Sequence, residues 1–560
     1  MACDLLIKNT RIVDGTGRPA FDGALAVEGG RIIAVGDADG PARRVIDAQG
    51  LVVAPGFIDI HTHYDAQVTW DPLCTPSCYH GVTTVVMSNC GYGMAPVRPE
   101  DRDYTMGMFS CVEDVSKSTL VAGLPWEWET LPEYLDWLRG RGLGINVAVQ
   151  VGHSAIRRYV VGPEAHQREA SPAEVQEMAG LVRQGLQAGA VGFTTSRVAH
   201  QRGEFGEPIP SFVASEDELF ALAGVLRELD RGFIGINPRT KILDFNQEDR
   251  DQLFRLARST GRMVNWNEFN HRWEYPDQWR SLLDFMENAH RHGARIYAVM
   301  RCQKMNRYFN LRQTGIFDGS AAWRDFMALE HEAKERRLED RDGLRALARE
   351  IASAFPESRP RFQRIGVALA ALDQNRPLED RFLTDVAQER GVDPMELFLD
   401  IAREEKLETE FAFFGVMNGD DSAVEAMLRS PATITGISDA GAHLNTECGA
   451  DYPTYFLGRW VRERGVVSLE EGVRALTSFP ADLAGFRDRG VLRPGAAADL
   501  CLFDPETIGP ERVEIWNDLP GGHSRKVKRA RGVEAVVVNG QVLLERGEPT
   551  GALPGRVISN

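Results

Sequence analysis

Two histidines that follow an apolar run are the residues best suited to chemistry in this sequence. The run at 56–60, within APGFIDIHTHYD, reads as a buried strand and is followed directly by His61-Thr62-His63. Side chains two positions apart on a strand point to the same side, so both imidazoles can face one ion. Because imidazole nitrogen is a common zinc ligand, the pair predicts a metal site.

Two further apolar runs end at a thiol and at a carboxylate. GVTTVVMSNCGYG ends at Asn89-Cys90 before a glycine turn, and TITGISDAGAH delivers Asp439 into a loop of small residues. A thiolate is a soft metal ligand, and a carboxylate can bind a metal and accept a proton from attacking water. Taken alone, Cys90 reads as a small buried residue and Asp439 as a turn or helix cap. Beside the histidine pair, we expect both to be ligands, with Asp439 as the catalytic residue.

Strand-like runs alternate with amphipathic helical stretches through the middle of the chain. The runs include INVAVQVG, AVGFTTS, FIGINP, MVNWNEF and RIYAVM, each followed by loop residues or a helix. Repeated strand-then-helix order predicts a parallel sheet, and about eight such units predict a (β/α)8 TIM barrel. A doubly wound α/β sheet is the alternative. In a barrel the candidate ligands lie at the carboxyl ends of strands, where active sites are built.

The two ends of the chain have a different pattern. Short apolar runs and turn residues fill 4–53, and VVVNGQVLL near the carboxyl end carries an Asn-Gly hairpin signal. We expect 1–55 and 484–560 to form one small β-sandwich beside a barrel at 56–483. Long charged helices at 319–383 predict a helical insertion, which is either a solvated face or a lid over the site.

Composition excludes several classes of function. The chain has 560 residues, 43% of them hydrophobic, with a formal net charge of -17 and a pI near 5.3. A protein this acidic is not expected to bind nucleic acid, so we expect a small-molecule or peptide-like substrate. No segment reads as a signal peptide or membrane span, which predicts a cytoplasmic protein. The sequence is compatible with a homo-oligomer.

Cysteine usage indicates a reducing compartment. Eight cysteines in so long a chain indicate no disulfide framework. Cys74 and Cys78 with His80 have the spacing of zinc ligands, but no second ligand pair stands nearby. We therefore expect no second zinc site there.

Several of these motifs occur together in one family. APGFIDIHTHYDAQ, GVTTVVMSNCG, LPWEWETLPEYLDWL, NVAVQVGHSAIR, TGISDAGAH and the segment from YPTYFLGRW onward resemble the N-acyl-D-amino-acid deacylases (D-aminoacylases) of the amidohydrolase superfamily. The likeness runs over most of the chain and is weakest in the inserted helices. It implies a barrel flanked by a β-sandwich and a zinc-activated water that cleaves an amide bond in an N-acyl amino acid. His61 and His63 match the family's first metal-binding pair, Cys90 its ligating cysteine and Asp439 its catalytic aspartate.

This chain departs from the family at the ends of two middle strands. The family places metal-binding histidines there, whereas FIGINPRT and MVNWNEF supply Asn237 and the pair Asn265 and Asn267. Neutral amides are poor zinc ligands. Three outcomes stay open, in this order: one zinc ion on His61, His63 and Asp439 with or without Cys90; substitution by His200 or His271; or no catalytic metal.

A set of polar residues after the strands is expected to meet the substrate. Cationic side chains could clamp a substrate carboxylate, and amides or an imidazole could orient it, although each also reads as a structural or solvated residue. The candidates are His153, Asn237, Arg239, Asn267 and Arg301, with Lys241 and Lys304 behind them. Two rival functions remain: the same barrel acting on a cyclic amide, carbamate or modified peptide, and a binding protein that has lost its metal.

Overall fold

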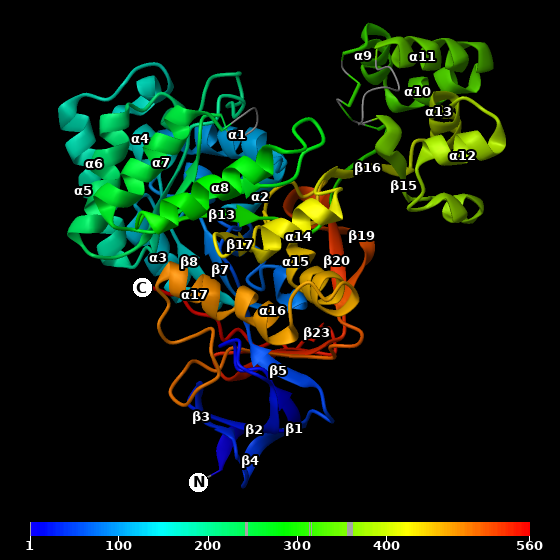
Figure 1. Ribbon diagram of the computed structural model, residues 1–560. Helices are drawn as coiled ribbons and strands as arrows, with labels where there is room; N and C mark the ends of the chain where they lie inside the picture. Colours follow the sequence, from blue (N-terminus) through cyan, green and yellow to red (C-terminus); the bar gives the residue numbers. More distant parts are fainter. Residues whose placement is uncertain (1, 241–244, 313, 315, 318, 355–361) are drawn as a thin grey trace.

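The computed structural model describes residues 2–560 except 241–244, 313, 315, 318 and 355–361 (Figure 1). Its central strands are short and almost wholly buried, as expected for strands covered on both faces. They form two parallel sheets. One has the order β6-β7-β8 and the other the order β17-β13-β12-β11-β10-β9. Their bounds are β6 (Phe57–Asp59), β7 (Val82–Met87), β8 (Asn146–Val149), β9 (Val151–Gly152), β10 (Gly192–Ser196), β11 (Phe233–Asn237), β12 (Val264–Phe269), β13 (Ile296–Met300) and β17 (Thr433–Thr435).

The two parallel sheets are joined at both ends. Only Gln150 separates β8 from β9, so one extended segment contributes to both sheets. At the other end, Thr62 after β6 forms a parallel bridge with Ala440 after β17. The ends of β6 and β17 therefore lie side by side although nearly 380 positions of sequence separate them.

Helices follow most of these strands, which confirms the predicted alternation in a mixed α/β fold. Several begin with strong capping signals. At α5, the N-cap residue Ser171 and Glu174 form a reciprocal capping box, and Pro172 is the first residue of the helix. Figure 1 shows α5 to α8 along one side of the central strands. The helices are α1 (Arg102–Glu113), α2 (Lys117–Gly123), α3 (Leu131–Gly140), α4 (His153–Val161), α5 (Pro172–Ala188), α6 (Glu216–Glu228), α7 (Gln247–Thr260), α8 (Gln278–Arg291), α14 (Asp421–Arg429), α15 (Tyr452–Tyr455), α16 (Leu469–Leu476) and α17 (Ser478–Ala484).

Strands from both ends of the chain share one nine-stranded sheet. The junction is the antiparallel pair of β5 and β18, and Val53, Leu500 and Val537 lie in the core of this part. The sequence patterns at the two ends predicted such a joint β unit. Its strands are β1 (Cys3–Ile12), β2 (Phe21–Glu28), β3 (Arg31–Gly36), β4 (Ala42–Asp47), β5 (Val52–Pro55), β18 (Leu500–Phe503), β21 (Val533–Val538), β22 (Gln541–Glu545) and β23 (Glu548–Pro549). A separate hairpin pairs β19 (Gly509–Leu519) with β20 (His523–Arg531).

The inserted segment forms a lobe that projects from the rest of the molecule (Figure 1). Its helices pack around their own core, in which Trp323 and Phe398 are fully buried. The lobe also contains a sheet of order β14-β16-β15, which the sequence reading of a helical insertion did not anticipate. The elements are β14 (Met305–Phe309), α9 (Ala321–Met327), α10 (His331–Glu339), α11 (Arg341–Ala354), β15 (Ile365–Leu369), α12 (Leu383–Arg390), α13 (Pro394–Glu404) and β16 (Glu410–Met417).

In the part of the chain that the structure describes, no helix is both long and apolar enough to cross a membrane. All eight cysteines carry free thiols.

Candidate metal centre

His61 and His63 leave the end of β6 on the same side, as the strand period predicts. Both side chains are buried, and their ring centroids lie 5.3 Å apart in an edge-to-face arrangement. The amide of Asn89 fixes this strand end, because its Nδ2 donates to the carbonyls of Thr62 at 3.2 Å and Val86 at 3.0 Å. The imidazoles are therefore held against the neighbouring strand β7.

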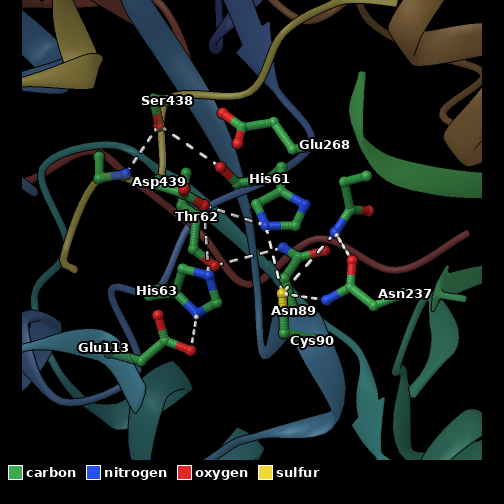
Figure 2. A network of polar contacts seen from close by, with 12 residues as sticks. His61, Thr62, His63, Asn89, Cys90, Glu113, Asn237, Glu268, Ser438 and Asp439 are labelled. Carbon is green, nitrogen blue, oxygen red and sulfur yellow. Dashed lines mark hydrogen bonds and ion pairs between the residues drawn. The ribbon is translucent and has the colours of Figure 1, made fainter. Parts of the chain in front are cut away.

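Cys90 and Asp439 complete the cluster from the turns after β7 and β17. The Cys90 thiol lies 3.6 Å from His61 Nε2, and the ligand atoms of His61, His63 and Cys90 lie within 4.8 Å of one another. Asp439 Oδ1 lies 3.2 Å from His61 Nε2 and 3.5 Å from His63 Nε2. Figure 2 shows the four side chains converging on one space.

The two turns hold Cys90 and Asp439 in a left-handed backbone conformation. The φ angle is 56° at Cys90 and 52° at Asp439. For residues other than glycine this conformation costs about 1–3 kcal/mol, and such strain concentrates at functional sites. The loop of Asp439 is anchored to β6, since Ser438 Oγ donates to the His61 carbonyl at 3.4 Å (Figure 2).

Asn237 and Asn267, at the strand ends where the resemblance led us to expect histidines, lie beside the thiol. Asn237 Nδ2 donates to Cys90 Sγ at 3.2 Å, and Asn267 Nδ2 lies 3.7 Å from the same sulfur. Asn267 Nδ2 also donates to Asn237 Oδ1 at 2.9 Å. Both side chains are buried. The amides thus present N–H donors to the sulfur, an arrangement that stabilises a thiolate and offers no strong ligand for a second ion.

Arg301, directly after β13, links Asp439 to two further carboxylates. Its Nη2 lies 3.2 Å from Asp439 Oδ2, its Nε donates to Glu268 Oε1 at 2.8 Å, and its Nη1 lies 3.2 Å from Glu447 Oε2. The guanidinium is 3% exposed. Arg301 therefore faces the cluster, but all three of its nitrogens are already engaged by this chain.

The charges of the cluster depend on one another. Burial raises the pKa of Asp439, but His61, His63 and Arg301 outweigh burial and hold it well below its usual range. Burial likewise raises the pKa of Cys90, yet the two imidazoles lower it to about 5. The pKa of His61 is lowered by burial but raised to about 9 overall by the thiolate and carboxylate. The negative charges of Cys90 and Asp439 and the positive charges of the two imidazoles thus support one another, and a metal ion bound here would take the place of the imidazole protons.

Glu113 is a neighbour of the cluster that sequence reasoning missed. It is the last residue of α1, and its Oε1 lies 3.5 Å from His63 Nδ1. Burial raises the pKa of Glu113 to about 7 despite the nearby charge of His63. A carboxylate behind the ring nitrogen is the usual way to orient a ligating histidine. Glu268 and Glu447 were also missed: Glu268 follows Asn267 in the run MVNWNEF, where only the amides were considered, and no local motif surrounds Glu113 or Glu447.

The donor set fits a divalent metal ion. Two imidazole nitrogens, a thiol and a carboxylate oxygen are a ligand combination typical of zinc, and all approach one another within a few ångströms. Among the described residues, His61, His63 and Cys90 are the one group whose ligand atoms are close enough together to hold an ion.

The other predicted residues lie elsewhere. His153 belongs to a separate buried network, where its Nε2 lies 2.9 Å from Glu218 Oε1, and Arg239 Nη2 donates to the Phe212 carbonyl. His200 is exposed in a loop after β10, and His271 donates its backbone N–H to Asn418. Lys304 pairs with Asp421. Lys241 lies outside the described residues.

Comparison with known proteins gives this centre a family context. Residues 44–544 match the sequence pattern of the amidohydrolase family. The chain is 28% identical to the N-acyl-D-aspartate deacylase of Alcaligenes xylosoxydans xylosoxydans, over 99% of this chain and 95% of the relative. It superposes with a TM-score of 0.69 and 26% identity on the N-acyl-D-glutamate deacylase of Bordetella bronchiseptica, solved with zinc and a phosphonate inhibitor, covering both chains in full.

A second solved structure is relevant to the number of ions. It is a D-aminoacylase with a binuclear metal centre, described as activated by one metal and attenuated by the second. It has a TM-score of 0.67 and 25% identity to this chain, and the whole of both chains is covered.

The chain belongs to the amidohydrolase family, which is the class that the central fold and the cluster at its strand ends define. Within that class its relatives are the N-acyl-D-amino-acid deacylases, so the resemblance read from the sequence motifs is confirmed. The protein is a metal-dependent hydrolase of carbon–nitrogen bonds other than peptide bonds.

Proposed function

We propose that the protein hydrolyses the amide bond of an N-acyl amino acid at a centre that holds one zinc ion. The ion would be bound by His61, His63 and Cys90, whose ligand atoms lie within 4.8 Å of one another, and the fourth position beside Asp439 would be left for water. The observation that carries the proposal is the convergence of these four side chains from three strand ends, with two amides beside the thiol.

In this proposal the central strands close into one (β/α)8 barrel that spans 56–483. The parallel bridge between Thr62 and Ala440 supports closure, because it joins the first strand end to the last. The segments 1–55 and 484–560 would then form the β-sandwich beside the barrel. Such an architecture places the cluster at the carboxyl ends of the strands, where barrel enzymes carry their active sites.

Asp439 would be the general base of the reaction. An ion bound in the cluster supplies a lowered pKa for the attacking water and polarises the substrate carbonyl. Asp439 Oδ1, which faces both imidazoles, accepts the proton of that water and returns it to the leaving nitrogen as the carbon–nitrogen bond breaks. The products are a carboxylic acid and an amino acid.

Arg301 would be a positioning residue for Asp439. Its Nη2 holds Oδ2 of the carboxylate, so the other oxygen, Oδ1, stays directed at the histidines. The expected role of Arg301 as a clamp for the substrate is not favoured by this geometry, since its guanidinium is buried among Glu268, Asp439 and Glu447. Asn237 and Asn267 would hold the Cys90 thiolate rather than a second ion.

Metal content and a substrate panel test the proposal together. We expect about one zinc ion per wild-type chain, lost in His61→Ala/His63→Ala and retained in the control His200→Ala, with circular dichroism as the check on folding. Loss of metal in His200→Ala would instead support the shifted-register site, and a metal-free wild type would overturn the zinc centre.

The substrate panel compares N-acetyl derivatives of D- and L-amino acids with cyclic amides. We expect turnover of the N-acyl amino acids by the zinc-loaded wild type. Turnover of cyclic amides alone would replace the proposed substrate class while leaving the metal centre intact.

A further inference from the structure

A cleft of about 1080 Å³ opens beside the candidate metal centre. Its walls are the β14–β16 sheet of the inserted lobe, the β19–β20 hairpin and two loops at 114–116 and 445–446. The loops connect the cleft to the centre. Asp114 follows Glu113, which approaches His63, and Thr446 precedes Glu447, which pairs with Arg301. Two residues of the cleft wall are therefore next in the chain to carboxylates that contact the centre.

One wall of the cleft is a strip of apolar side chains interrupted by one cation. Met305, Arg307 and Phe309 alternate along β14, so they share a face of the sheet. Opposite Met305 and Arg307 on β16 lie Met417 and Phe413, which also line the cleft, whereas Phe411, opposite Phe309, is buried in the core of the lobe. A five-residue strand spans about 13–17 Å, and β14 begins shortly after Arg301. The strip thus runs from the edge of the centre to the core of the inserted lobe.

Arg307 is the cation available to a ligand on this strip. It is exposed, and its guanidinium forms no salt bridge with any residue that the structure describes. The other cations that line the cleft are occupied: Arg525 by Asp518, Lys526 by Glu410 and Arg312 by Glu408. The charge of Arg307 helps to lower the pKa of Asp114, another residue of the cleft wall, but forms no salt bridge with it. An exposed cation beside aromatic and thioether side chains suits a ligand that carries both a carboxylate and an apolar chain.

The cleft is too large to be filled by an amino acid that carries only a short acyl group. Pockets of roughly 300–1,000 Å³ enclose drug-sized ligands, and this cleft is larger than that. An N-acetyl amino acid would leave the half-buried Phe413 and Met417, and the exposed Ile515 of the hairpin wall, uncovered. Water on such a surface is unfavourable compared with a hydrocarbon chain.

We infer that the cleft binds the long acyl chain of an N-acyl amino acid, with Arg307 as the partner of the carboxylate. This inference rests on the proposed amide hydrolysis and narrows its substrate class to fatty-acyl amino acids. Hydrolysis of such a substrate consumes one water and releases a fatty acid and a free amino acid.

A series of acyl chain lengths on one amino acid tests the inference. The zinc-loaded enzyme is assayed with N-acetyl, N-octanoyl and N-lauroyl derivatives below micelle-forming concentrations. We expect kcat/KM to rise with length, by up to about fourfold for each methylene that becomes buried. Phe413→Ala should reduce the ratio of N-lauroyl to N-acetyl kcat/KM by about tenfold or more.

The neighbouring residue Phe414 provides the matched control. It lies on the opposite face of β16 and packs against Phe382, so Phe414→Ala should leave the chain-length ratio unchanged. Arg307→Gln should lower kcat/KM for the free acids about tenfold but not for their carboxamides, and Arg307→Lys should restore part of the loss. Equal kcat/KM for all chain lengths would overturn the inference.

Failure of the inference can be told apart from failure of the proposed function. If N-acetyl amino acids are hydrolysed without any length preference, the function stands and the cleft inference falls. If no N-acyl amino acid is hydrolysed, the proposed function is wrong. Calorimetric titration with an N-lauroyl amino acid then tests whether the cleft binds the acyl chain. Binding that Phe413→Ala weakens supports the inference, whereas no binding to the wild type overturns it.

Discussion

The guanidinium of Arg301 reaches three carboxylates, and one of them, Asp439, also lies within 3.5 Å of both His61 and His63. An arginine can serve three acceptors because its five N–H groups form a fixed planar fork. Lysine has one compact charge and cannot do the same. The orientation of Asp439 therefore depends on a side chain that makes no contact with the proposed ion.

Arg301→Gln tests this dependence at the residue scale. The substitution leaves Asp439, Glu268 and Glu447 without their common cation, which should destabilise the fold by about 3–5 kcal/mol and reduce kcat. Zinc content should stay at the wild-type value when measured under folding conditions, because His61, His63 and Cys90 are unchanged. The stability of Arg301→Lys should lie between those of the wild type and Arg301→Gln. Loss of zinc together with activity would mean that Arg301 is needed for the metal site itself.

Part of this centre could be predicted from single residues and their neighbours in sequence. His61, His63, Cys90 and Asp439 each follow an apolar run that reads as a strand, so their common location follows from the strand ends. The partners Glu113, Glu268 and Glu447 come from a helix end, a strand and a loop. Their contacts arise only once the chain is folded, which is why the sequence did not indicate them.

At the scale of elements, the centre depends on the close approach of the loop after β17 to the end of β6. Gly441 makes this possible. Its φ is 92°, and a Cβ atom there would lie 2.5 Å from the carbonyl carbon and oxygen of His63. No side chain fits without moving Asp439 away from the histidines.

Gly441→Ala should therefore displace the loop that carries Asp439. We expect kcat to fall by about 10²-fold, since small misplacements of reacting groups have effects of that size. Gly465→Ala is the control: its φ is also positive, at 59°, but no atom lies within 4 Å of the added carbon. Both variants should lose about 1–2 kcal/mol from backbone strain, and only Gly441→Ala should lose activity. Equal kcat in the two variants would contradict this account of the loop.

Element prediction succeeded where a pattern was long or repeated. The alternation of strands and helices and the β segments at both chain ends were anticipated from turn residues and apolar periods. The sheet of the inserted lobe was not. β14 and β15 are five residues each, and charged helices with a strong period dominate the sequence between them.

For the molecule as a whole, the buried His80 links the central fold to the carboxyl-terminal hairpin. Its Nε2 donates to the Lys528 carbonyl at 3.0 Å, and its Nδ1 lies 2.7 Å from Thr454 Oγ1. Burial, with the charge of Lys528, lowers the pKa of His80 to about 4, although Asp451 acts in the opposite direction. His80, which follows Cys74 and Cys78 in the sequence, is thus held by hydrogen bonds within the fold.

The lowered pKa of His80 predicts a loss of stability in acid. Above pH 6.5 the residue is neutral in both the folded and the unfolded chain, so its full contribution to stability is present. As the pH falls from 6.5 towards 4, the unfolded chain binds a proton that the folded chain does not, and stability falls by about 3 kcal/mol once the pH is below 4.

His80→Gln keeps a donor for the Lys528 carbonyl and removes this titration. Urea midpoints at pH 7.5 and 5 should therefore show a smaller acid-induced loss in His80→Gln than in the wild type, by about 2 kcal/mol in unfolding free energy. His331→Gln, at an exposed position on α10, should behave as the wild type does. Equal losses in all three proteins would mean that His80 is not held neutral by its burial.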